Sequence, residues 1–260
     1  PRHLAPREHR FLGGEPDRVQ KVVRRAKDMG RELAAFFAGQ WDSRQRLSGG
    51  IARIATLVGQ ARATEPNVLF THGGAFFVGD FMFQEYLGIA ELQILTALGM
   101  DAMTLGNHEF DLYPSTLEYV LSTAGWPGEG FPILCANLDS SGDPVINNFV
   151  QPYTIKQVGN LKIGIIGLNT EFANAGSNPS PLVILPPLDV TQGWVDELRN
   201  NQQCNFVIVI SHLGDLEDPV LASSVSGIDV ILGGHSHTEI STPVVVGQTL
   251  IIQAGEFYGK

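Results

Sequence analysis

Short apolar strands that alternate with helices constrain the fold of this 260-residue chain more than any other feature. From residue 67 onward, helical patterns separate most of the successive buried-strand patterns. The strand patterns cover residues 67–71, 101–104, 131–136, 206–211 and 229–232, and the helical patterns cover 84–98, 112–123 and 191–200. The turns Gly159-Asn160 and Gly247-Gln248 are typical of hairpins. The pattern predicts a layered α/β fold that includes some antiparallel strands.

The chain divides near residue 48. Residues 17–39 follow helical spacing, and Ser48-Gly49-Gly50 interrupts the pattern before a second predicted helix at 51–64. Residues 1–62 carry 13 Lys and Arg against 6 Asp and Glu, whereas the remainder carries 4 against 21. We therefore expect a basic helical segment at 1–48, packed on or preceding a folded domain at 49–260. Its basic residues lack interleaved aromatics, so a solvated helix face explains them better than a nucleic-acid partner.

The sequence predicts no membrane-spanning segment, and its cysteines say little about the redox compartment of the protein. No apolar stretch approaches the roughly 18 residues that span a bilayer, so no transmembrane segment is expected. Cys135 and Cys204 lie in apolar runs without a close partner in sequence, and we interpret them as buried free thiols.

Polar side chains follow three of the predicted strands at the point where each strand ends. Asn107 and His108 follow the strand at 101–104, and His212 follows the strand at 206–211. His235 and His237 follow the strand at 229–232 and a Gly-Gly pair. Taken alone, each of these residues is explained more simply as a loop or cap residue than as a metal ligand. Because ligands gather outside the carboxyl ends of strands, the set together predicts a metal site. Imidazole nitrogen and amide oxygen suit Zn, Mn, Fe or Ni better than Ca.

Three runs resemble the calcineurin-like metallophosphoesterase family: Gly106-Asn107-His108-Glu109-Phe110-Asp111, Ser211-His212 and Gly234-His235-Ser236-His237. The closest branch is the 5′-nucleotidase and 2′,3′-cyclic-nucleotide phosphodiesterase branch, and the likeness runs from about residue 49 to the end. It implies a layered β-sandwich flanked by helices that hydrolyses phosphate esters, with nucleotides as the expected substrates. By the same analogy, the expected location is periplasmic or extracellular.

The resemblance also implies a role for each site residue. In this family two divalent metals hold a bridging hydroxide that attacks phosphorus in line. By motif, the ligands of one metal would be Asn107, His212 and His235, and His237 would bind the other. His108 resembles the residue that stabilises the transition state or protonates the leaving oxygen. Asp111 resembles its carboxylate partner, which fixes the ring and favours the imidazolium.

The chain also departs from the family pattern. Alignment on Gly74 places Ala75 where the family has its metal-bridging Asp, and a methyl group cannot bind a metal. The family's Asp-x-His motif has no counterpart. The opening residues 1–6 resemble the segment that follows that motif, and His3 is a candidate substitute ligand. Residues 255–260 resemble the point where relatives enter their last strands, and we therefore expect no C-terminal specificity domain within these 260 residues.

Two hypotheses follow from these departures. The first is a phosphoesterase with impaired activity, which binds one metal or none in place of the two that the family uses. The second is a catalytically degenerate relative that serves as a binding or structural subunit. A domain without its first strand exposes a sheet edge, so the second hypothesis predicts a protein partner near the N-terminal edge.

Overall fold

A computed structural model describes residues 50–79, 81–128 and 130–256. The predicted basic segment at 1–48 and the candidate His3 lie outside these ranges. Two main sheets organise the described residues, and a third, two-stranded sheet pairs β4 (Leu138–Asp139) with β8 (Val183–Ile184).

The smaller main sheet has four strands in the order β1-β2-β3-β5, and all its pairs are parallel. Its strands are β1 (Thr71–His72), β2 (Ala102–Thr104), β3 (Ile133–Leu134) and β5 (Val150–Gln151). The larger sheet has the order β11-β12-β10-β9-β7-β6. Its strands are β6 (Tyr153–Val158), β7 (Leu161–Asn169), β9 (Phe206–His212), β10 (Val230–Gly233), β11 (Val244–Val246) and β12 (Thr249–Gln253). Its central strands β7, β9, β10 and β12 are parallel, so their carboxyl ends meet at one edge.

The two sheets pack face to face across an aliphatic core. This core combines Ala102 and Leu134 from the smaller sheet with Ile165, Ile208 and Ile210 from the larger one. Side chains alternate along a strand, so the neighbouring residues of β7 and β9 point to the opposite face. There they pack against helices, and the molecule has four layers in the order helix, sheet, sheet, helix.

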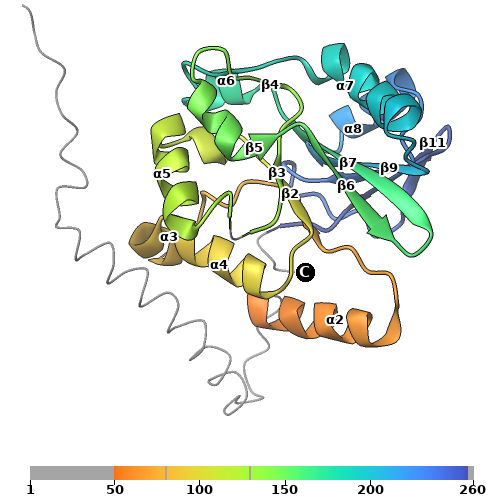
Figure 1. The fold of residues 1–260 in the computed structure, drawn as a ribbon, viewed down its shortest axis with the longest axis horizontal. Coiled ribbons are helices and arrows are strands. Elements are labelled where there is room, and N and C mark those ends of the chain that lie inside the picture. The colour runs from red at the N-terminus through yellow and green to blue at the C-terminus, as the bar shows by residue number, and fades with distance from the viewer. Residues whose placement is uncertain (1–49, 80, 129, 257–260) are drawn as a thin grey trace, which may run out of the picture.

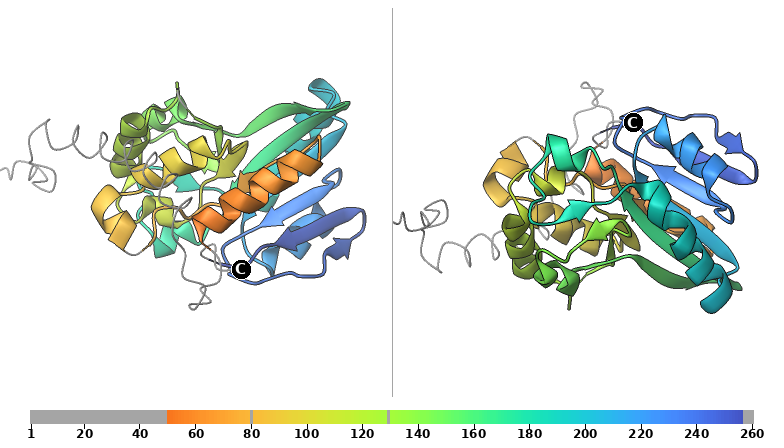
Figure 2. Two further views of the ribbon diagram at one scale, coloured as in Figure 1. Left: turned by 90° about the horizontal axis from the view of Figure 1, so that it is seen from below. Right: turned by 90° about the horizontal axis from the view of Figure 1, so that it is seen from above.

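Helices cover both outer faces, as Figures 1 and 2 show. On the smaller sheet lie α3 (Phe81–Tyr86), α4 (Ile89–Ala97) and α5 (Pro114–Ala124). The leucines of α4 and α5 join the largest hydrophobic cluster, and Phe83 of α3 packs against it. On the larger sheet lie α7 (Pro187–Asp196) and α8 (Glu217–Ser224). The remaining helical elements are α2 (Ile51–Thr64), α6 (Ala173–Gly176), the 3₁₀ turns η1 (His108–Phe110) and η2 (Pro144–Asn148), and the π-helical turn η3 (Glu197–Asn201).

The structure confirms the predicted fold class and the predicted helix at 51–64. The hairpins at Gly159-Asn160 and Gly247-Gln248 are also present, as β6–β7 and β11–β12. The helix predicted at 84–98 is wrong in one respect, because Leu87 and Gly88 have positive φ angles that divide it into α3 and α4. Among the described residues, no helix is long and apolar enough to cross a membrane.

Candidate metal centre and acid–carboxylate pair

The strand ends bring three of the six predicted site residues together: Asn107, His212 and His235. His212 is the last residue of β9 and lies opposite Asn169, the last residue of β7. The loop after β10 carries His235, whose ring centroid lies 5.0 Å from that of His212. The loop after β2 carries Asn107, which reaches His212 from the smaller sheet. The predicted site therefore lies where the carboxyl ends of both sheets meet.

His212 and Asn107 present two electron-pair donors to each other. The carbonyl oxygen of Gly73 lies 2.5 Å from His212 Nδ1, so this nitrogen carries the ring hydrogen. Burial, with help from the neighbouring histidines, lowers the pKa of His212 to about 3, and the ring is neutral near pH 7. Its Nε2 atom is then an acceptor, and it lies 3.2 Å from Asn107 Oδ1. Two acceptors at this separation suit adjacent positions around one cation.

His235 and His237 differ in their surroundings, although both have left-handed backbone conformations with φ of 71° and 61°. His235 lies beside His212, and burial lowers its pKa. His237 is half-exposed, and its Nδ1 lies 3.1 Å from Glu256 Oε2. Between them, the Ser236 hydroxyl accepts a hydrogen bond from the amide of Asp215 and so fixes the loop. The structure thus places His235 beside the other predicted ligands of the first metal and His237 in a pair with a carboxylate.

His108 and Asp111 form the contact that an acid–carboxylate pair requires. The turn η1 places them three residues apart on the same side, with 2.6 Å between His108 Nδ1 and Asp111 Oδ2. The other carboxylate oxygen of Asp111 accepts a hydrogen bond of 2.8 Å from the Ser177 hydroxyl. The imidazole is therefore oriented by a carboxylate that is itself held in place.

Glu109 is a residue of the site that sequence reasoning did not single out. Its side chain is completely buried, and its carboxylate accepts hydrogen bonds from the amides of Ala75 (2.9 Å), Phe77 (3.0 Å) and Gly106 (2.5 Å). Burial raises the pKa of Glu109, while these backbone hydrogen bonds oppose the rise. The signal in the sequence is its place inside the run from Gly106 to Asp111. Its role is to join the loop after β1 to the loop after β2.

The loop after β1 packs tightly against the site. A Cβ atom at Gly74 would lie 2.7 Å from the amide nitrogen of Gly106 and 3.0 Å from His212 Nδ1, so only glycine fits there. The next residue, Ala75, has a φ of 63°, a conformation that Asp and Asn adopt more readily than Ala. The backbone at position 75 is therefore suited to an acidic residue that the sequence does not supply.

Two more side chains join the site from the strand ends. His72 ends β1 and accepts a hydrogen bond from the amide of Gly74, and burial lowers its pKa to about 4. Asn169 is fully buried and donates to the carbonyl oxygen of Gly106, 2.9 Å away. No sequence motif could have identified either residue, because the place of each in the site depends on which strand ends meet in space.

The donor set fits one cation in part and does not fit a two-metal centre. Asn107, His212 and His235 supply an amide oxygen and two imidazoles. Within residues 50–256, apart from positions 80 and 129, no group of three or more His, Cys, Asp or Glu side chains could hold a metal ion. Ala75 offers no donor between two metals, and His237 contacts Glu256.

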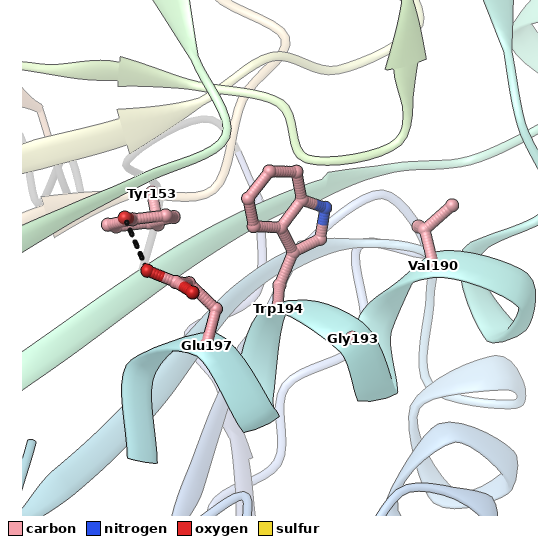
Figure 3. A pocket seen from close by; sticks show the side chains of 5 residues that line it. All are labelled: Tyr153, Val190, Gly193, Trp194 and Glu197. Atoms are coloured by element: carbon pink, nitrogen blue, oxygen red, sulfur yellow. Dashed lines mark hydrogen bonds between the residues drawn. The ribbon is translucent and has the colours of Figure 1, made fainter. Parts of the chain in front are cut away.

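A separate pocket of about 500 Å³ lies between β6 and α7. Figure 3 shows its lining of Tyr153, Val190, Gly193, Trp194 and Glu197. The indole of Trp194 donates to the carbonyl oxygen of Ala136, and its ring centroid lies 5.6 Å from that of Tyr153. None of the six predicted site residues lines this pocket, so it is distinct from the candidate metal centre.

Known proteins share both the sequence pattern and the fold. The family model described as calcineurin-like phosphoesterase matches residues 38–239. The trifunctional nucleotide phosphoesterase protein YfkN of Bacillus subtilis is 31% identical over 242 residues, which cover 80% of this chain and 17% of that protein. Bovine 5′-nucleotidase is 37% identical over 201 residues, which cover 76% and 34%.

A solved structure of a protein with a similar sequence has a similar fold. The crystal structure of a 5′-nucleotidase precursor from Thermus thermophilus has a TM-score of 0.75 at 37% identity and covers 82% of this chain and 44% of that one. The matched region spans only 17% to 34% of the two curated relatives named above.

Proposed function

Because this chain belongs to the calcineurin-like phosphoesterase family, we propose that it is a hydrolase of phosphate esters, with nucleotides as its substrates and with impaired activity. The observation that carries the hydrolase assignment is the His108–Asp111 pair beside the buried Asn107–His212 pair. The names of the relatives, which are nucleotide phosphoesterases and 5′-nucleotidases, support a nucleotide substrate. A periplasmic or extracellular location stays a prediction from the same resemblance.

The chain's own residues would have two roles, which are to bind a metal ion and to transfer a proton. A bound divalent ion would supply an activated water and offset charge on the phosphoryl oxygens. Asn107, His212 and His235 would hold such an ion. His108 would donate its Nε2 proton to the leaving oxygen, because the contact of Asp111 with Nδ1 orients the ring. Without a donor at Ala75, a second ion lacks its shared ligand, and this is our reason for proposing impaired activity.

A second candidate function is a catalytically degenerate binding or structural subunit. The observation that favours it is the carboxylate of Glu109, which fixes the loop that carries Ala75 through backbone hydrogen bonds and needs no bridging metal. In addition, β1 is an edge strand of the smaller sheet among the described residues. An edge of this kind accepts a further strand, from this chain or from a protein partner.

Replacement of Ala75 by Asp separates the two candidates. We expect Ala75→Asp to bind more metal than the unmodified chain and to hydrolyse an aryl phosphate at least about tenfold faster, because the new carboxylate supplies the shared ligand. Metal content would be measured by mass spectrometry after incubation with Mn²⁺ or Zn²⁺. Ala75→Asn is the matched control, since it has the same shape and tolerates the left-handed backbone but carries no charge.

Either of two outcomes would revise this proposal. If the unmodified chain binds two metals and turns over as fast as Ala75→Asp, the activity is not impaired. If Ala75→Asp gains neither metal nor turnover, the hydrolase assignment fails for this chain and the subunit function remains.

A further inference from the structure

Phe172 is an exposed aromatic residue beside the candidate site. It lies three residues beyond Asn169, the end of β7, and immediately precedes α6. Its side chain is 56% exposed, and its ring centroid lies 6.4 Å from that of His235 at an interplanar angle of 44°. A large apolar ring is therefore presented to solvent beside a predicted metal ligand.

Local packing holds this ring in place. A Cβ atom added to Gly176 would overlap the ring of Phe172, so the ring lies directly over the glycine backbone. The following residues are tied to the acid–carboxylate pair. The Ser177 hydroxyl donates to the carboxylate of Asp111, and the side-chain amide of Asn178 donates to the backbone carbonyl oxygen of Asp111. The segment from Phe172 to Asn178 is thus tied to Asp111, which contacts His108, and its first residue lies beside His235.

We propose that Phe172 contacts the leaving group of the ester and favours leaving groups that carry a planar aromatic ring. This inference rests on the proposed function, because it places the phosphoryl group among Asn107, His212, His235 and His108. The alcohol part of a bound ester must then extend away from the buried ends of the strands. One direction is past His235, where Phe172 offers an aromatic surface on which a base or an aryl ring can stack.

The test compares pairs of esters that differ in the aromatic ring alone. Affinities for adenosine 5′-monophosphate and ribose 5-phosphate would be measured by titration calorimetry in the presence of Mn²⁺. We expect the nucleotide to bind about tenfold more tightly, the low end of the range for stacking on one aromatic side chain. Phenyl phosphate and ethyl phosphate form the second pair. A preference confined to one pair identifies a nucleoside or an aryl ester as the favoured class.

Two variants act on the ring in different ways. Phe172→Ala removes it, and Gly176→Ala displaces it with a methyl group while the phenylalanine stays in the sequence. Both should abolish the preference and leave the affinity for ribose 5-phosphate unchanged. Leu161→Ala is the control, since Leu161 is a half-exposed apolar residue at the opposite end of β7. That variant should keep the preference of the unmodified chain.

The outcomes distinguish this inference from the proposed function. Equal affinity of the unmodified chain for both members of each pair, or a preference that survives in Phe172→Ala and Gly176→Ala, overturns the role of Phe172 and leaves the phosphate site standing. Failure of every ester to bind overturns the proposed function, and the role of Phe172 falls with it.

Discussion

At the scale of single residues, Glu109 gives the sharpest prediction of stability. Its two carboxylate oxygens accept three backbone hydrogen bonds in a fully buried position. In Glu109→Gln, an amide NH₂ group must face at least one of these N–H donors. We expect a loss of about 2–3 kcal/mol in the free energy of unfolding, the usual cost of an unpaired buried polar group. The melting temperature should fall by roughly 4–10 °C for a chain of this size.

Glu85→Gln is the control for this substitution, because Glu85 is an exposed residue of α3. Thermal unfolding followed by circular dichroism measures both variants. If Glu109→Gln melts with the unmodified chain, the carboxylate does not join the two loops and the hydrogen bonds contribute little.

The sequence predicted which residues belong to the candidate site better than it predicted how deeply each side chain is buried. Strand-end positions predicted Asn107, His212 and His235 as candidate site residues, because polar residues after buried strands stand out in a linear pattern. The same pattern could not show that Glu109 is buried, since burial of an acid depends on what packs over it from other parts of the chain. The pairing of His237 with Glu256 likewise depends on a contact between residues that are far apart in sequence.

At the scale of elements, α8 carries a buried acid that makes stability depend on pH. Asp218 is fully buried between α8 and the larger sheet, where it accepts a hydrogen bond from the Ser211 hydroxyl. Burial, followed by repulsion from Glu217 and Asp215, raises its pKa from 3.8 to about 7. The folded state therefore binds a proton that the unfolded state has lost between about pH 4 and 7. The stability from this group is complete below pH 4 and is lost as pH rises through 7.

Asp218→Asn should remove this pH dependence. The amide keeps the oxygen that accepts from Ser211 and replaces Asp218 Oδ2, an atom without a hydrogen-bond partner in the described structure. At pH 8 the variant should be about 2 kcal/mol more stable than the unmodified chain, with little difference at pH 4. Urea denaturation at both pH values measures this change, and the exposed Asp196→Asn serves as control. A variant that is less stable at pH 8 would show that the ionised carboxylate is favoured.

Helix α8 itself was not predicted, although it supports two strands that carry site residues. Its sequence, Glu217 to Ser224, contains a proline and few apolar positions, so it shows little helical periodicity. By contrast, α2 was predicted at its observed bounds because a glycine pair precedes it and its apolar spacing is regular. The strands of the smaller sheet are shorter than their apolar runs. Leu105, for example, is buried but lies in the loop after β2, because a residue can be buried without pairing in a strand.

At the scale of the whole molecule, the sequence predicted the layers but not their assignment to sheets. Alternating strands and helices indicated α/β layers, and the resemblance implied a sandwich. The division into a four-stranded and a six-stranded sheet depends on long-range pairing, such as β10 with β12 and β7 with β9. Such pairings bring together strands that are separated in the chain by other elements and loops, so local periodicity does not specify them.

The division of the chain near residue 48 leads to a prediction for the whole molecule. The three hydrophobic clusters of the described structure are built from residues between Ile51 and Ile251. Because Ser48-Gly49-Gly50 separates the predicted basic segment from the predicted domain, a chain that starts at Gly50 should unfold in one cooperative transition, with a melting temperature within about 3 °C of the full chain. Calorimetry of the two chains, with sedimentation to follow their association state, tests this. If residues 1–49 instead pair with the edge strand β1, their removal should lower the melting temperature by more than this and promote self-association, because the edge would be uncovered.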